Sequence, residues 1–140
     1  MAIEIANQTR SNINRSLIER AVKKVLKFAK QEGNVSVVIV GDAAMQKLNK
    51  LYRSKNKPTD VLSFSEADSQ FPDNTFIGEI VIDWLQIKRQ AKILKHSAAW
   101  ELAFIVIHGM LHLIGYEDET KRGALEMERL GNNLIKKITI

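Results

Sequence analysis

The sequence contains no cysteine. Without thiols the chain can form neither a disulfide framework nor a thiolate metal site. Any metal must therefore be bound by nitrogen and oxygen ligands. The absence of cysteine also fits the reducing cytoplasm, which is the location we expect.

Long hydrophobic runs are missing as well. The longest apolar stretch without a charged residue covers residues 102–116, which is fifteen residues, and it includes two histidines. A membrane-spanning helix needs about 20 apolar residues, so this stretch predicts a buried core helix, and we expect no membrane association. Residues 1–7 lack a basic start followed by an apolar core, so we also expect no secretory signal.

The 140 residues are 45% hydrophobic and 26% charged, which is typical of a globular chain. A chain of this length can bury most of its apolar surface and fold unaided. No internal repeat or low-complexity segment divides it. We therefore expect a single domain over residues 1–140.

The net charge of +5 is unevenly distributed. Residues 1–60 carry 12 Lys and Arg against five Asp and Glu, a balance of +7, and residues 61–140 carry nine against 11, a balance of −2. Such asymmetry indicates a face that binds a polyanion. It is a weak signal alone, because many basic proteins never touch nucleic acid.

Hydrophobic periodicity predicts an α/β (α+β) fold, with about four strands covered by about five helices. The expected strands cover residues 3–5, 35–40, 61–64 and 76–83. The expected helices run from Asn14 or Ser16 to about residue 31 and over 42–51, 84–94, 97–114 and 120–137. Polar loops are expected at 53–60 and 66–74. Residue 42 is the expected cap of the second helix.

The chemically informative helix lies near the C-terminal third. His108 and His112 are four residues apart, which places both imidazoles on one helix face, where they could hold one metal ion. Such a pair alone is often no more than two partly buried polar residues. Here the helix is otherwise apolar, so unpaired imidazoles would be costly to bury. Gly115 can end the helix in the left-handed conformation, and the acidic residues 117–119 then follow at the spacing that a third ligand needs.

Gly109 distinguishes this helix from that of the zinc peptidases. Those enzymes carry a glutamate base directly after the first histidine, in the pattern H-E-x-x-H. Glycine at this place argues against the ordinary peptidase mechanism, although not against metal-activated water. A metal-bound hydroxide would then have to serve in its place.

Three blocks of the sequence together resemble the YbeY family of endoribonucleases, also called rRNA maturation factors. Residues 108–118 are similar to the family signature H-G-x-L-H-L-x-G-Y-D-H. Residues 52–64, which read Y-R-S-K-N-K-P-T-D-V-L-S-F, resemble a second hallmark, and Gly78–Ile82 resembles its G-D-I-x-I strand. The blocks come in the family's order and span most of residues 35–120.

The resemblance implies a third metal ligand ten residues after the first, where most members carry histidine and this chain carries Asp118. We expect His108, His112 and Asp118 to hold one Zn²⁺, with Glu117 and Glu119 open as alternatives to Asp118. Two neutral imidazoles and one carboxylate leave a zinc site at +1 rather than +2, which weakens its hold on phosphate. A carboxylate also makes Mn²⁺ or Fe²⁺ conceivable, and the same ligand set occurs in iron oxygenases.

The resemblance also implies that Arg53 faces the metal across a cleft. A guanidinium binds phosphate oxygens in a bidentate manner and stays charged, so we expect Arg53 to be catalytic and substrate-binding. Lys55 and Lys57 are candidates for holding flanking phosphates. Without the resemblance, this loop would be interpreted as a solvated polar segment.

Arg20, Lys23, Lys24, Lys27 and Lys30 form a basic stripe on the first expected helix. It is either an ordinary solvated helix face or an electrostatic track for RNA. Phe28, with Leu17, Ala21 and Val25, has the spacing of the buried face. Trp84 and Trp100 are expected to anchor the core, and His96 to lie at the surface or to cap a helix.

The leading hypothesis is a metal-dependent endoribonuclease that cuts single-stranded RNA in rRNA maturation and ribosome quality control. Its expected partners are rRNA and the ribosome or its small subunit, and no DNA. A metallopeptidase is a second hypothesis. A third is a non-catalytic, ribosome-associated assembly factor in which the metal only stabilises the loop after Gly115.

Overall fold

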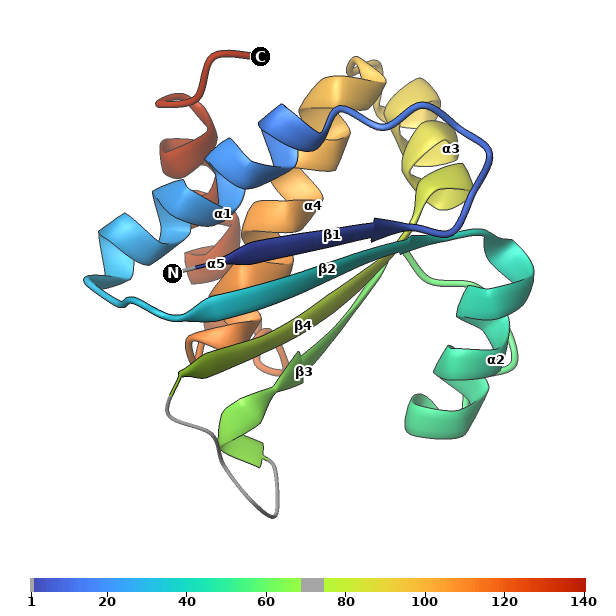
Figure 1. Cartoon of the computed structure of the whole chain (residues 1–140), viewed down its shortest axis with the longest axis horizontal. Coiled ribbons are helices and arrows are strands. Elements are labelled where there is room, and N and C mark those ends of the chain that lie inside the picture. The colour runs from blue at the N-terminus through green and yellow to red at the C-terminus, as the bar shows by residue number, and fades with distance from the viewer. Residues whose placement is uncertain (1, 69–74) are drawn as a thin grey trace.

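A computed structural model describes residues 2–68 and 75–140 of the chain, and in this part it has four strands and five α-helices (Figure 1). This confirms the expected α/β fold. The elements in chain order are β1 (Ile3–Asn7), α1 (Arg15–Ala29), β2 (Asn34–Val40), α2 (Asp42–Arg53), β3 (Val61–Ser65), the 3₁₀ turn η1 (Glu66–Asp68), β4 (Phe76–Asp83), α3 (Trp84–Leu94), α4 (Ala98–Leu113) and α5 (Lys121–Ile135).

The four strands form one mixed sheet in the order β1-β2-β4-β3. The pairs β1–β2 and β2–β4 are parallel, and β3 runs antiparallel to β4 with Ser63 opposite Ile80. Strand β3 is therefore an edge of the sheet. This edge matters for function, because the free side of β3 is where the chain places its candidate site.

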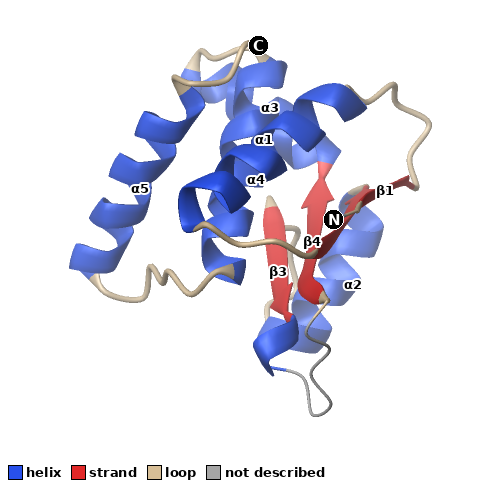
Figure 2. Ribbon diagram, turned by 60° about the vertical axis from the view of Figure 1, so that its left-hand side comes forward, coloured by secondary structure: helices blue, strands red, loops and turns tan. Residues whose placement is uncertain are grey.

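The two faces of the sheet are covered unequally. Alternate residues of the strands, such as Val37 and Ile80, belong to the main core, to which α1, α3, α4 and α5 also contribute. The other face carries a smaller cluster in which Val40 and Val81 pack with Met45 of α2. Figure 2 shows α1, α4 and α5 on one side of the strands and α2 on the other. Strand alternation thus supplies two separate apolar surfaces.

Helix α1 differs from the expectation at one buried position. Its N-cap is Asn14, whose side chain accepts a hydrogen bond from the Leu17 amide at 3.1 Å, and it ends at Lys30 in the left-handed conformation. The buried face is made by residues 17, 18, 21, 22, 25 and 26. Phe28 was expected to be buried but is 41% exposed, because it lies at the edge of this face.

The segment around residue 42 also needs correction. The N-cap of α2 is Gly41 rather than Asp42, and the helix continues past the expected residue 51 to Arg53. Arg53 is therefore the last residue of a helix, not part of a loop. Of the loop expected at 66–74, residues 66–68 form η1, and 69–74 lie outside the described residues.

The two tryptophans pack against the core but are only partly buried. Trp100 stacks between Phe104 and the exposed His96, with ring centroids 5.1 and 4.1 Å away, so His96 lies at the surface as expected. Within the described ranges, no helix is long and apolar enough to cross a membrane.

Candidate metal centre and cleft

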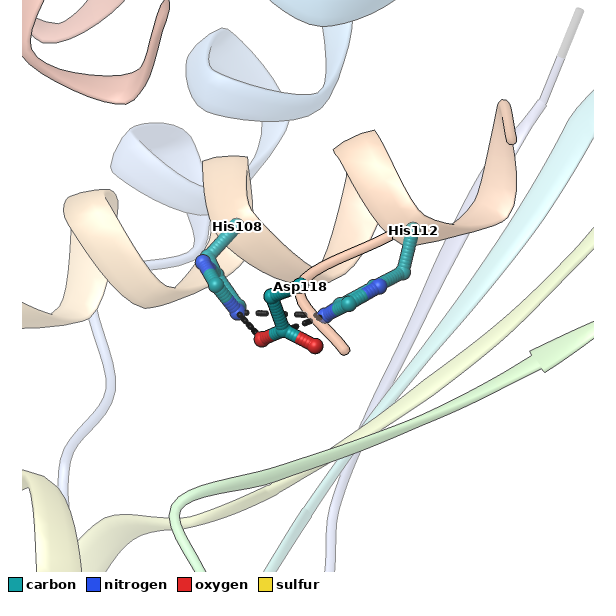
Figure 3. Close-up of side chains that lie close together, drawn as sticks. All are labelled: His108, His112 and Asp118. Carbon is teal, nitrogen blue, oxygen red and sulfur yellow. Dashed lines mark hydrogen bonds and ion pairs between the residues drawn. The ribbon is translucent and has the colours of Figure 1, made fainter. Parts of the chain in front are cut away.

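Helix α4 fixes the direction of the two histidines. Ser97 caps its N-terminus, accepting a hydrogen bond from the Trp100 amide at 3.0 Å, and ten of its 16 residues are buried. His108 and His112 project from the face toward β3 (Figure 3), with side chains 26% and 27% exposed. Their Nε2 atoms lie 3.1 Å apart. A helix this firmly packed holds both rings with little freedom.

Gly115 turns the chain back toward these rings, as the sequence predicted. Its φ of +107° lies in a region that disfavours residues with a side chain. The turn is closed by the Tyr116 amide, which donates to the Leu111 carbonyl at 3.0 Å. The next residues then pass beneath α4, and this brings Asp118 to the histidines (Figure 3).

Asp118 completes a compact set of three ligand atoms. Its Oδ2 lies 3.4 Å from Nε2 of His108 and 3.4 Å from Nε2 of His112. In a tetrahedral zinc site with bonds of about 2.0–2.1 Å, neighbouring ligand atoms are separated by about 3.3 Å. The three observed separations of 3.1, 3.4 and 3.4 Å fit this geometry. The chain therefore presents a group of residues that could hold a metal ion.

A hydrogen bond outside this set selects the histidine tautomer. Nδ1 of His112 lies 3.0 Å from the Tyr116 carbonyl oxygen. Because a carbonyl only accepts, Nδ1 must carry the proton and donate it, which leaves the lone pair of Nε2 for a metal. Burial, followed by the neighbouring His112, lowers the pKa of His108. Both effects favour the neutral imidazole of His108, the form that binds metal.

One cleft contains these ligands and Arg53. Its volume is about 1110 Å³, and β3, the end of α2 and residues 112–119 line it. Arg53 is exposed and lines this cleft as predicted. Lys55 and Lys57 are exposed too, but neither is among the described lining residues. Glu117 and Glu119 line the cleft without joining the three ligands.

Asn49 holds the segment that follows Arg53, which sequence reasoning missed. Its side chain is 1% exposed, and its Nδ2 donates to the Lys57 carbonyl at 2.8 Å. The Asn49 carbonyl also accepts from the Lys55 amide at 3.3 Å. These bonds fold the segment back onto α2, so that Arg53 is presented from a fixed helix end. A polar residue on the inner face of an amphipathic helix was the available signal.

Ser63 was also missed, and it ties β3 to the histidine helix. Its hydroxyl donates to the Gly109 carbonyl at 3.1 Å. Gly109 itself faces the sheet, and a Cβ placed on it would lie 3.1 Å from Cγ2 of Ile80 and 3.2 Å from Cγ2 of Val61. Residue 109 thus lies where the helix meets the sheet. Its lack of a side chain allows α4 to approach the sheet closely.

Comparison with known proteins gives consistent results. The family model described as endoribonuclease YbeY matches residues 3–139. A protein named endoribonuclease YbeY from Roseiflexus sp. (strain RS-1) is 42% identical over 125 residues, which cover 84% of this chain and 78% of the relative. Another with that name, from Chelativorans sp. (strain BNC1), is 35% identical over 145 residues, covering 99% and 88%.

Among solved structures, the solution structure of TM1509 from Thermotoga maritima superposes with a TM-score of 0.64. The two sequences are 27% identical, and the match covers 96% of this chain and 87% of that one. The fold therefore has a counterpart in a solved structure over almost the entire chain.

Proposed function

Because the chain belongs to the endoribonuclease YbeY family, we propose that it is a metal-dependent endoribonuclease that cuts single-stranded RNA during rRNA maturation. The family assignment supports RNA as the substrate. Metal dependence, the preference for single strands, ribosome quality control and a cytoplasmic location are further parts of this proposal. We expect rRNA and the small ribosomal subunit to be its partners.

The observation that carries the proposal is the set formed by His108, His112 and Asp118. Its atom separations fit tetrahedral zinc, and the set opens onto a large cleft, so a bound ion would be accessible to substrate. A bound ion would supply Lewis-acid activation of the phosphodiester and of its attacking nucleophile. We propose Zn²⁺, with Mn²⁺ or Fe²⁺ as the alternatives that a carboxylate ligand permits.

The protein's own groups have separate roles in this proposal. Arg53 binds the nonbridging oxygens of the scissile phosphate and offsets the negative charge that grows there in the transition state. The hydrogen bond from His112 to the Tyr116 carbonyl keeps the imidazole oriented. Lys55 and Lys57, outside the cleft lining, contact flanking phosphates. Without a base at position 109, the nucleophile's proton must pass to solvent or to another cleft group.

A metallopeptidase role is disfavoured by the glycine at position 109. In the peptidase motif the residue after the first histidine supplies the catalytic glutamate. Here that position is pressed against Ile80 and Val61 of the sheet. This chain carries glycine there, so the helix offers no glutamate base.

The proposal is tested with labelled single-stranded rRNA fragments and with casein, each with zinc-loaded protein. We expect endonucleolytic cleavage of RNA, its loss in His112→Ala, and intact casein. Arg53→Lys should cleave RNA poorly, whereas Arg129→Lys, an exposed arginine on α5 outside the cleft lining, should behave as wild type. Cleavage of casein with intact RNA would instead support the peptidase. Ribosome association without either activity would support the assembly factor.

A further inference from the structure

The cleft that contains the candidate centre is acidic, which is unexpected for a protein that binds RNA. Six carboxylates line it: Glu32, Asp60, Glu66, Glu117, Asp118 and Glu119. Among the described lining residues, Arg53 is the only lysine or arginine. One divalent ion would leave the lining negative. The attraction that holds an RNA backbone must therefore come largely from a basic surface beside the cleft.

Helix α1 provides such a surface at the cleft border. Lys23, Lys27 and Lys30 are exposed, and none of them forms an ion pair with the residues that the structure describes. Lys30 is followed directly by Gln31 and Glu32, which line the cleft. The rise of a helix separates Lys23 from Lys27 by about 6 Å along its axis, and Lys30 follows after about 4.5 Å. This row of charges leads toward the site.

Arg20 does not belong to this row in the way the sequence suggested. Its guanidinium donates to the carbonyl oxygen of Thr139 near the C-terminus. Arg20 thereby fastens the end of the chain to α1. The free cations of the stripe are those nearer the cleft, at the C-terminal half of the helix.

Phe28 adds a second observation of a different kind. It is 41% exposed on a helix whose other large apolar residues are buried, and it follows Lys27 and lies one turn after Lys24 on the same helix side. Lys23, Lys27 and Lys30 lie on the adjoining side of the helix. An aromatic ring beside lysines can bind single-stranded nucleic acid, with phosphates on the cations and a base on the ring.

We propose that Lys23, Lys24, Lys27, Lys30 and Phe28, hereafter the α1 surface, bind single-stranded RNA beside the catalytic cleft. This inference rests on the proposed function for its ligand. It adds a contact surface on α1 that holds the strand while the scissile phosphate occupies the cleft. The lysines bind backbone phosphates, and Phe28 stacks on an unpaired base.

Fluorescence anisotropy with a short labelled single-stranded RNA and zinc-loaded full-length protein tests the surface, with RNA integrity checked on gels. The variant is Lys23→Gln/Lys27→Gln. Its matched control is Lys88→Gln/Lys92→Gln, two exposed lysines with the same spacing on α3, outside the described cleft lining. Lys27 and Lys92 both lie in the last turn of their helices, so any effect on helix stability is matched.

We expect the α1 variant to bind about 25-fold more weakly at 0.1 M salt, and the slope of log affinity against log salt to fall by about 1.4, the value for two lost phosphate contacts on a single strand. The control should keep the wild-type affinity and slope. Equal losses of RNA affinity in the α1 variant and the α3 control, or unchanged RNA binding by the α1 variant, would overturn the proposal.

Phe28→Ala separates stacking from charge. It should weaken binding of the single strand about fivefold or more while leaving the salt slope unchanged, and a duplex of the same sequence should not be affected. A Phe28→Ala protein with wild-type affinity for the single strand would remove the ring from the surface.

Cleavage by the same preparations distinguishes this inference from the proposed function. RNA that depends on the α1 surface for binding but is never cut would leave the surface in place and contradict the nuclease. If the wild type cleaved RNA and the α1 variants bound RNA as tightly as the wild type, the proposed α1 surface would be contradicted but the proposed nuclease function would not. Wild-type protein that does not bind single-stranded RNA even at low salt would overturn the inference.

Discussion

Replacing Asp83 by asparagine should change how the stability of this protein depends on pH. Asp83 ends β4, is fully buried and caps α3, its Oδ1 accepting from the amides of Leu85 and Gln86 at 3.0 and 3.4 Å. Its Oδ2 accepts no hydrogen bond from the described residues and lies against the carboxyl group of Asp42. Burial and this neighbour raise the pKa of Asp83 to about 7.

The sign of the effect follows from the two states of the chain. Between the ordinary pKa of 3.8 and about 7, folded Asp83 holds a proton that the unfolded chain releases, so stability falls as pH rises across this window. Each pH unit in this window lowers the free energy of unfolding by about 1.4 kcal/mol. The loss between pH 5 and 7 is therefore about 2–3 kcal/mol. The pKa of Asp42 is lowered to about 2, chiefly by its hydrogen bond with Arg89. Asp42 is therefore ionised throughout this pH range, and its contribution to the free energy of unfolding does not change with pH.

Asparagine retains the cap oxygen and offers an amide donor toward Asp42, but it does not titrate. We expect the Tm of Asp83→Asn, measured by calorimetry from pH 5 to 8, to fall less with rising pH than that of wild type. The difference at pH 8 should be roughly 8 °C, since about 1 kcal/mol corresponds to about 3–4 °C in a chain of this size. Glu128→Gln, at an exposed position on α5, serves as control. If the Tm values of wild type and Asp83→Asn changed with pH in parallel, Asp83 would not be the group that titrates in this range.

Three further predictions concern the site. Arg53→Lys should lower RNA cleavage about 10²-fold or more with unchanged metal content, because lysine cannot reproduce a bidentate contact to phosphate; full activity would exclude the role. Gly109→Ala should lower the free energy of unfolding by about 1–2 kcal/mol in denaturant titrations, because crowding against Ile80 and Val61 outweighs the gain in helix propensity; a stabilised variant would contradict the packing argument. Asp118→His should keep zinc and move the pH-dependence of cleavage to lower pH, because the site gains positive charge; an unchanged profile would count against the electrostatic argument.

The sequence predicted most of the fold because its strands and helices have clear periodicity. Helix spacing predicted the two histidines as a pair, and the turn at Gly115 left residues 117–119 open for the third ligand. The choice of Asp118 came from the family resemblance. The buried side of α1 was predicted except at its edge, where Phe28 lies. A single apolar residue at the border of a helix face can lie on either side, and only the packing against α4 decides which.

Features that depend on contacts between distant segments could not be predicted. The bond from Ser63 to Gly109 joins residues 46 positions apart, and the acidic character of the cleft arises from carboxylates at positions 32, 60, 66 and 117–119. Nothing local marks Asp83 as more strongly buried than other aspartates at helix starts. These features became visible only when the sheet order and the position of α4 were known.

The proposed activity requires a metal held by His108, His112 and Asp118, and the metal content of the purified protein tests this requirement. Plasma mass spectrometry should be run on untagged wild type beside Asp118→Ala, with Glu119→Ala as the neighbouring acidic control. The account predicts near-stoichiometric metal, most of it zinc, in wild type and in Glu119→Ala, and its loss in Asp118→Ala. Wild type without metal even after zinc is supplied, or a metal that survives in Asp118→Ala, would contradict the proposed centre.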